Sequence, residues 1–355
     1  MISRSKNKIT IRDIAEECGV SVQTVSRVIN NRPDVSPATR QKIEAFIASS
    51  GFRPNAVARS LVSRRSHTLG VIIGGLRYIS VGYTLNGINE ACEKAGYTLI
   101  IKELLQIDST DISPLIMTLV ENQVEGIIYA APDLNNNVLY VQSHLPAFCP
   151  PIIFVKSQPN PKFTTISIDN YGGACKAVEH LIANGCSHIG HIAGSLSWLE
   201  ARQRKQGWED TLRKHGLAVD EASWIEGDWS AERGMALFPQ LLQRNEKLDG
   251  LFVGNDEMAM GVVRYANNAG IRIPADVAVV GFDDQKESAY FSPSLTTISH
   301  PLREMGKLAT TTMISMLESD GEPSQPLQIT LETNLITRES SENREYINGI
   351  RVRVS

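Results

Sequence analysis

The 355-residue sequence lacks the features of membrane and secreted proteins. No segment approaches the run of about 20 apolar residues that a membrane-spanning helix needs. The basic N-terminal residues Arg4, Lys6 and Lys8 are not followed by the apolar run of a signal peptide. The five cysteines are scattered and include no CxxC pair, which argues against a disulfide framework and fits a reducing compartment. We therefore expect a soluble, cytoplasmic protein without a membrane partner.

Signatures of catalysis and metal binding are missing as well. The sequence has no GxSxG, HExxH or P-loop motif. His188 and His191 have the spacing of a metal-ligand pair, but they fall in a β-like run, where positions i and i+3 point to opposite faces. Asp283 and Asp284 are adjacent, so their side chains should diverge. We expect no enzyme activity, no metal site and no cofactor.

Charge is unevenly distributed along the chain. The first 67 residues contain 12 Lys and Arg against 5 Asp and Glu, whereas the remainder contains 23 against 34. A small basic segment on an acidic body is typical of a polyanion-binding module whose body does not adhere to the polyanion. The length is sufficient for two or three domains with sizeable cores.

The basic segment contains two short amphipathic helical patterns joined by a turn. Thr10 can cap the first helix, Gly19 interrupts the pattern, and Ser21 can cap the second. The apolar positions of the two patterns are Ile11, Ile14, Ala15, Cys18, Val25, Val28 and Ile29. Such a pair forms a helix-turn-helix, whose second helix enters the major groove of DNA, although a simple helical hairpin has the same periodicity. The outward face of the second helix carries Val22, Gln23, Ser26 and Arg27.

A third helix completes this small unit. Ser36 can cap it, Pro37 suits its first position, and it should end near Ser49. Its apolar face would be Ile43, Phe46 and Ile47, and the three helices would share a core of about fifty residues, which is marginal on its own.

Beyond His67, short β-branched runs alternate with helical patterns. We expect strands at residues 69–73, 98–101, 126–129, 152–155, 165–169, 188–193, 223–226, 250–253, 277–281 and 327–337. We expect helices at residues 84–94, 112–122, 173–184, 201–215, 231–243, 257–268 and 302–317. Alternation of this kind predicts parallel sheets covered on both faces, with ligands at the carboxyl ends of strands. Two such units, divided near Asp169, would leave a cleft between them.

Residues 10–30 and the stretch GFRPNAVARSL at 51–61 resemble the DNA-binding headpiece and hinge of the LacI/GalR family of transcriptional regulators. The resemblance continues to about Arg338, and the stretches GDWSA at 227–231 and LTTI at 295–298 are similar to the lactose-repressor branch. It implies a multi-domain chain, with an all-α helix-turn-helix headpiece and an α/β core of two doubly wound subdomains similar to periplasmic binding proteins. The implied parts are a headpiece at 1–50, a hinge and linker at 51–67, an N-subdomain at 68–169 and 302–327, a C-subdomain at 170–301 and 328–340, and a tail at 341–355.

The resemblance also implies which residues contact DNA. Val22 and Gln23 match positions that choose the operator sequence, and Arg27 matches a base-reading position; Arg suits guanine and Gln suits adenine. Leu61 matches a leucine that wedges into the minor groove when two hinge helices pair. The implied DNA-binding residues are Thr10, Ser21, Val22, Gln23, Thr24, Ser26, Arg27, Asn30, Asn55, Ala58 and Leu61. For Ser21, Thr24 and Asn30, helix capping and solvation explain the residue type equally well.

A sugar site needs carboxylates and amides for vicinal hydroxyls, an Arg fork, and an aromatic face for the ring. By resemblance, Arg204 is the effector-binding arginine and Trp229 the ring-stacking tryptophan, whereas Trp208 belongs to the core. The implied effector-binding residues are Gly74, Tyr78, Asp169, Arg204, Trp229, Asn255 and Asp283. Gly74 and Tyr78 depart from the lactose-repressor branch, which has a hydroxyl and an aliphatic side chain there. Helix capping is the simpler alternative for each strand-end acid.

The family resemblance thus implies a sequence-specific transcriptional repressor of a sugar-utilisation operon, released by a galactoside-like inducer in the cleft. Its partners would be a pseudo-palindromic double-stranded DNA operator, a small-molecule sugar effector and a second copy of the chain. The tail beyond Arg338 has no leucine-heptad repeat, so we expect a homodimer and not a tetramer. A corepressor-dependent regulator and a sugar-binding receptor without DNA function remain as alternatives.

Overall fold

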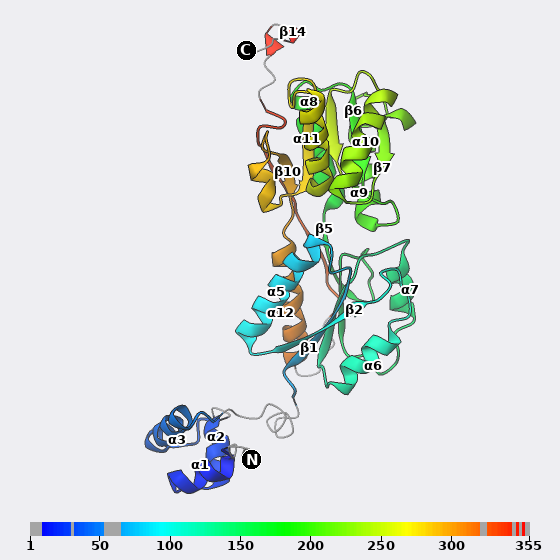
Figure 1. Ribbon diagram of the computed structural model, residues 1–355. Helices are drawn as coiled ribbons and strands as arrows, with labels where there is room; N and C mark the ends of the chain where they lie inside the picture. Colours follow the sequence, from blue (N-terminus) through cyan, green and yellow to red (C-terminus); the bar gives the residue numbers. More distant parts are fainter. Residues whose placement is uncertain are drawn as a thin grey trace, which may run out of the picture. The chain divides into compact units, whose positions relative to one another are not determined.

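The computed structural model describes residues 9–29, 32–52, 65–319, 325–342, 346–347 and 350–351 (Figure 1). The chain divides into two compact units, Met1–His67 and Thr68–Ser355. In the described part of the chain, every helix is too short or too polar to cross a bilayer.

The first unit contains three helices, α1 (Ile11–Cys18), α2 (Val22–Ile29) and α3 (Pro37–Ser50). Thr10 and Asp13 form a capping box, in which Thr10 Oγ1 accepts from the Asp13 amide and the Asp13 carboxylate accepts from the Thr10 amide. Ser21 Oγ accepts from the Thr24 amide at 3.0 Å and begins α2. The expected helix-turn-helix is therefore confirmed, and its buried core consists of Ile14, Ala15, Cys18, Val25, Val28 and Ile43.

The second unit contains two six-stranded sheets. The first has the order β11-β5-β4-β3-β1-β2, and all its strands are parallel. Its strands are β1 (Thr68–Gly74), β2 (Thr98–Leu104), β3 (Gly126–Ala130), β4 (Ile152–Val155), β5 (Thr164–Ile168) and β11 (Gln328–Leu331). Its helices are α5 (Ile79–Ala95), α6 (Ser113–Glu121), α7 (Asn137–Ser143) and α12 (Leu302–Glu318).

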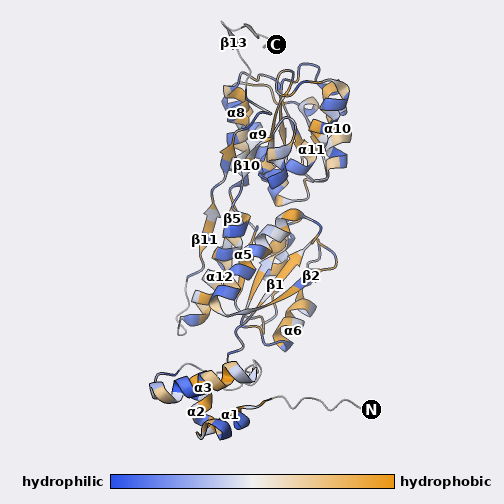
Figure 2. Cartoon of the chain, turned by 60° about the vertical axis from the view of Figure 1, so that its left-hand side comes forward, coloured by the Kyte–Doolittle hydropathy of each residue, from blue (hydrophilic) through white to orange (hydrophobic). Residues whose placement is uncertain are grey.

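Alternate residues of β1 enter different hydrophobic cores. Val71 and Ile73 pack with residues of α5 and α12, whereas Ile72 packs with residues of α6 and α7. Figure 2 shows the hydrophobic colouring of β1. Helices α5 and α12 approach closely, because a Cβ on Gly87 would overlap the carbonyl of Arg303. Burial on both faces explains why these strands are continuously apolar.

The second sheet has the order β12-β10-β9-β8-β6-β7, and only β12 is antiparallel to its neighbour among the strands described. Its strands are β6 (Ile189–Ala193), β7 (Trp224–Glu226), β8 (Gly250–Val253), β9 (Ala278–Asp283), β10 (Thr296–Ser299) and β12 (Asn334–Ile336). Helices α8 (Asn170–Ala183) and α9 (Leu199–Lys214) cover one face, and α10 (Ala231–Arg244) and α11 (Asp256–Ala269) cover the other. The short elements are η1 (Glu221–Ser223), η2 (Lys286–Tyr290), β13 (Tyr346–Ile347) and β14 (Ile350–Arg351).

The structure corrects three expectations about these elements. Residues 327–337 form two strands, of which β11 pairs with β5 in the first sheet and β12 pairs with β10 in the second. The chain therefore crosses from the first sheet to the second between Leu331 and Asn334, and not near Leu327. Helix α5 begins five residues before Thr84, because Tyr78 begins it without a side-chain cap that would mark the start. Helix α7 and strand β10 were not expected.

Trp208 is buried in the core, as expected, and its Nε1 donates to the carbonyl of Ile189.

Candidate functional site

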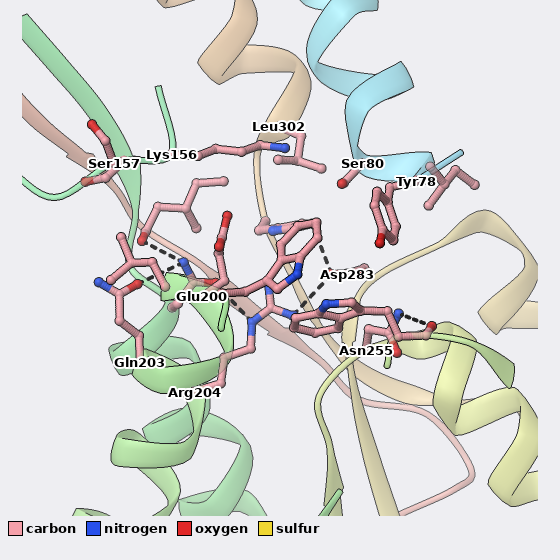
Figure 3. Close-up of a pocket in the computed structure, with 18 of the residues that line it drawn as sticks. Tyr78, Ser80, Lys156, Ser157, Glu200, Gln203, Arg204, Asn255, Asp283 and Leu302 are labelled. Atoms are coloured by element: carbon pink, nitrogen blue, oxygen red, sulfur yellow. Dashed lines mark hydrogen bonds and ion pairs between the residues drawn. The ribbon is translucent and has the colours of Figure 1, made fainter. Parts of the chain in front are cut away.

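A cleft lies in the second unit, at the carboxyl ends of strands from both sheets (Figure 3). It is lined by five of the seven predicted effector residues, Tyr78, Arg204, Trp229, Asn255 and Asp283. Tyr78 comes from the half that contains the first sheet, and the other four come from the half that contains the second. This placement agrees with the rule that open α/β sheets bind ligands beyond the carboxyl ends of their strands.

Gly74 and Asp169 do not line the cleft. Gly74 ends β1, where an added Cβ would lie 3.0 Å from Ile107 Cγ1 and 3.2 Å from Pro132 Cδ. Asp169 caps α8, because its Oδ1 accepts a hydrogen bond from the Gly172 amide at 2.7 Å. Helix capping, the simpler alternative, therefore accounts for Asp169.

Arg204 anchors the centre of the cleft. It is 4% exposed, and its guanidinium donates to Asn170 Oδ1 at 3.0 Å and to the Gly254 carbonyl at 2.5 Å. Its Nη1 lies 3.6 Å from Asp283 Oδ1, and its Cζ lies 3.6 Å from the ring centroid of Phe282. Burial lowers the pKa of Arg204, an effect that the charge of Asp283 opposes. A buried charge needs such partners, so the Arg204 side chain is held in one position.

Asp283 ends β9 at a φ of 123°, which turns its carboxylate toward Arg204 and away from Asp284. Its Oδ1 also lies 3.4 Å from His300 Nε2. Burial raises the pKa of Asp283 to about 7, although Arg204 opposes the shift. Burial holds the pKa of His300 well below its usual value, so the imidazole is neutral at pH 7. Asp284 instead accepts a hydrogen bond from Arg338 at 2.7 Å, so the two acids diverge as expected.

The raised pKa of Asp283 makes the stability of the protein depend on pH. Between 3.8 and about 7 the folded state keeps a proton that the unfolded state releases, so this group stabilises the fold at low pH and loses that effect as pH rises through 7. Asp283→Asn should remove this contribution, which is about 3 kcal/mol between pH 5 and pH 8. We expect thermal unfolding midpoints to fall less between these pH values for the variant than for the parent. An equal fall would contradict the raised pKa.

A hydrogen bond links the Asn255 side chain to the backbone of Trp229. Trp229 has a φ of 80°, which is rare for a bulky side chain, and Asn255 Nδ2 donates to its carbonyl at 3.0 Å. Asn255 Oδ1 also accepts from the Met258 amide and caps α11. Asn255 is thus both a helix cap and a cleft residue. Strained backbone of this kind is concentrated at functional sites.

Several lining residues were not predicted from the sequence. Trp198 precedes α9, and its ring lies 4.9 Å from that of Tyr78 and 5.6 Å from that of Trp229. Lys156 and Ser157 follow β4, where their position after a buried strand could have identified them. Glu200 precedes Arg204 by four residues on α9, and this helical spacing could have identified it.

The predicted DNA-reading face is exposed in the first unit. Val22 is 45% exposed, and Gln23 and Arg27 are also exposed, whereas Ser26 is half-buried. Arg27 Nη1 lies 3.5 Å from Asp34 Oδ2. Thr10, Ser21 and Thr24 take part in the helix caps. The predicted residues Asn30, Asn55, Ala58 and Leu61 lie outside the described residues.

His191 is a core side chain. It is fully buried, its Nδ1 is hydrogen-bonded to the Phe252 carbonyl at 2.9 Å, and its ring stacks on that of Phe252 at 4.7 Å. Burial lowers its pKa to about 3. Among the described residues, no cluster of three or more His, Cys, Asp or Glu side chains could hold a metal ion.

Comparison with known proteins gives the same division of the chain. Residues 10–55 match the family of bacterial regulatory proteins of the lacI type, and residues 178–341 match a periplasmic binding protein-like domain. Catabolite control protein A of Priestia megaterium is 30% identical, with 90% of this chain and 96% of that protein covered. The lactose operon repressor of Escherichia coli K12 is 30% identical, with 94% and 91% covered. The crystal structure of the lac repressor dimer bound to operator and the anti-inducer ONPF matches with a TM-score of 0.82 and 29% identity, with 94% and 99% covered.

Proposed function

Because the chain belongs to the LacI family and is a DNA-binding transcriptional repressor, not an enzyme, we propose that it represses a sugar-utilisation operon in the cytoplasm and that a neutral, galactoside-like sugar in its cleft releases it from the operator. The observation that carries the sugar effector is the convergence of Arg204, Asp283, Asn255 and Trp229 on one cleft. These side chains supply a planar donor, a carboxylate, an amide and an aromatic face, which are the groups that a pyranose ring requires.

We propose that the repressor binds a pseudo-palindromic operator as a homodimer. The headpiece has one recognition helix, and a twofold dimer presents two of them to two half-sites. The related lac repressor crystallised as a dimer on its operator.

The sugar would release the repressor from the operator by changing the arrangement of the two halves of the second unit. The chain crosses between the halves near Asp169, near Pro301 and between Leu331 and Asn334. A sugar that contacts Tyr78 on one half and Arg204 on the other favours one arrangement of the halves over another. That arrangement would set the spacing of the paired hinges, including the proposed wedge residue Leu61.

Fluorescence anisotropy of the full-length protein on DNA from upstream of its own gene tests this function. Binding should be tight, should weaken as salt is raised, and should be relieved by one sugar of a panel of mono- and disaccharides. Binding that requires an added ligand would replace the inducer with a corepressor. A sugar bound without any DNA binding would instead support a receptor.

A further inference from the structure

The three chain crossings between the halves of the second unit lie at one edge of the cleft. They follow β5, β10 and β11, near Asp169, near Pro301 and between Leu331 and Asn334. Strands β5 and β11 are neighbours at one edge of the first sheet, and β10 and β12 are neighbours at one edge of the second. Strands β1 and β3 lie beyond β4 in the first sheet, and β6 lies beyond β8 and β9 in the second. The loops that follow β1, β3 and β6 therefore meet at the edge of the cleft opposite the crossings.

A short antiparallel bridge joins the two halves at this opposite edge. It pairs Leu134, in the loop after β3, with Trp198, in the loop after β6. The Asn135 amide donates to the Ser197 carbonyl at 2.8 Å, and the amide that follows Trp198 donates to the carbonyl that precedes Leu134 at 2.9 Å. The halves are thus connected here by main-chain hydrogen bonds between loops of different sheets.

Side chains add two further contacts between the halves. The Tyr78 ring lies 4.9 Å from the Trp198 ring, edge to face, and packs against hydrophobic cores of both halves. Figure 3 shows Tyr78 projecting from the start of the light-blue α5 toward the second half. Arg202 of α9 donates to two main-chain carbonyls of the loop after β6, and its Nη2 donates to Asn136 Oδ1, in the other half, at 3.2 Å. Arg202 therefore holds its own loop in place and reaches across to the first half.

Asn136 is oriented for this contact and not for its usual local one. It precedes α7, where an asparagine side chain normally caps the helix, but it makes no such cap. Its φ of 63° is left-handed, a conformation that asparagine tolerates better than most residues. Its Oδ1 accepts from Arg202 and also from Gln158 Nε2, within the first half, at 3.2 Å. The side chain that could have capped α7 instead links the two halves.

We propose that these contacts form a latch, made by Tyr78, Leu134, Asn136, Trp198 and Arg202, and that a ligand enters and leaves the cleft only when the latch opens. A few hydrogen bonds and one ring contact are strong enough to favour the closed arrangement and weak enough to open without unfolding. The latch closes over an occupied cleft as it does over an empty one. It therefore slows association and dissociation alike and leaves the equilibrium affinity nearly unchanged. The gating role rests on the sugar effector of the proposed function, whereas the latch contacts do not.

Hydrogen–deuterium exchange of the full-length protein, followed by mass spectrometry, tests the latch without a ligand. Asn136→Gly removes the bond to Arg202 and keeps the left-handed backbone, which glycine adopts freely. The Leu199 amide, which lies in the other half, should then exchange about fivefold faster, the effect of losing one hydrogen bond. Gln158→Ala is the matched control, because it removes only the bond of Asn136 within the first half, and exchange should stay at the parent rate. Equal exchange of the Leu199 amide in the parent and in Asn136→Gly would overturn the latch.

Stopped-flow tryptophan fluorescence tests the gating role, with the sugar that binds best among the mono- and disaccharides. Asn136→Gly should raise the association and dissociation rate constants by the same factor, about fivefold, and change the dissociation constant by less than about twofold. Gln158→Ala should change neither rate. A faster dissociation alone, with the affinity weakened by the same factor, would make Asn136 a ligand contact and refute the gate.

A disulfide across the bridge should lock the latch. The flanking hydrogen bonds make Leu134 and Trp198 a non-hydrogen-bonded antiparallel pair, whose Cα atoms lie about 4.5 Å apart, a separation that suits a disulfide. The oxidised Leu134→Cys, Trp198→Cys protein should exchange the sugar more slowly than the same protein after reduction, by about tenfold or more in both rates. The oxidised parent is the control for the half-buried Cys149 and Cys175.

Equal rates in the oxidised and reduced double variant, with the disulfide verified by mass spectrometry, would contradict the gate. If no sugar binds the parent, the sugar effector of the proposed function fails, and exchange of the Leu199 amide still decides the latch. The two failures are therefore distinguishable.

Discussion

Replacing Arg204 with alanine is expected to weaken the sugar effector about 100-fold, so that the sugar no longer releases the operator. The variant leaves Asp283 without its cation and removes a planar donor from the centre of the cleft. Each hydrogen bond between a charged donor and the ligand contributes about 1.5–3 kcal/mol, so the loss of one or two accounts for an effect of this size. Operator affinity should change little, because the DNA-reading helix belongs to a separate compact unit. Calorimetry with the best sugar and anisotropy on the operator measure the two effects.

The matched control for this prediction is Arg213→Ala on the same helix. Arg213 is exposed and pairs only with Glu209 and Asp210 among the described residues, so its loss should affect neither ligand. Arg204→Ala should also lower the free energy of unfolding by about 3 kcal/mol, because it leaves the buried Asp283 carboxylate unpaired. Protonation of Asp283 would recover part of this loss. A folded Arg204→Ala protein that still responds fully to the sugar would remove Arg204 from the effector site.

Replacing Arg27 with alanine is expected to weaken operator binding by about 1–3 kcal/mol, or roughly 5- to 150-fold, and to relax the preference for one base pair. Arg27 is an exposed residue of α2, and its ion pair with Asp34 is solvent-accessible and therefore weak. The Arg27 side chain can therefore leave Asp34 and donate hydrogen bonds to a guanine. Anisotropy on the operator and on single-base variants of it measures both effects.

Arg12→Ala on α1 is the control for this prediction, because it removes the same charge from an exposed position outside the second helix. It should weaken all sequences alike and by less than Arg27→Ala, because it removes only general attraction to the charged DNA backbone. If Arg27→Ala behaved in the same way as Arg12→Ala, Arg27 would be a phosphate contact and not a base-reading residue.

The headpiece could be predicted almost completely, because its determinants are local. Thr10, Ser21 and Ser36 each cap a helix at the expected place, and the spacing of Ile14, Cys18, Val25 and Val28 indicates the buried face. Helix α5 was predicted less well, since its N-terminal residue Tyr78 makes no side-chain cap. The alternating pattern of residues 327–337 indicates which face of a strand is buried, but it does not identify the neighbouring strand. It therefore could not show that β11 and β12 belong to different sheets.

The cleft could be predicted only in part. Arg204, Trp229, Asn255 and Asp283 were identified by resemblance, and all four line it. Asp169 also follows the end of a strand, but its carboxylate caps the N-terminus of α8. Position at a strand end does not by itself distinguish a helix cap from a ligand-binding residue. Trp198 had no sequence signal, because its contacts with Tyr78 and Trp229 join residues that are far apart in the chain. Lys156, Ser157 and Glu200 were missed although their signals are local, namely the position after β4 and the spacing of one helical turn before Arg204.

Thermodynamic coupling between the two ligands tests the central claim most directly. The dissociation constant of the best sugar should be measured by titration of the free protein and of its complex with operator DNA. An inducible repressor must bind the sugar more weakly on the operator, by the same factor by which the sugar weakens the operator, about 5- to 150-fold. Identical sugar affinity in the two states would contradict release through the cleft, and tighter binding on the operator would make the sugar a corepressor.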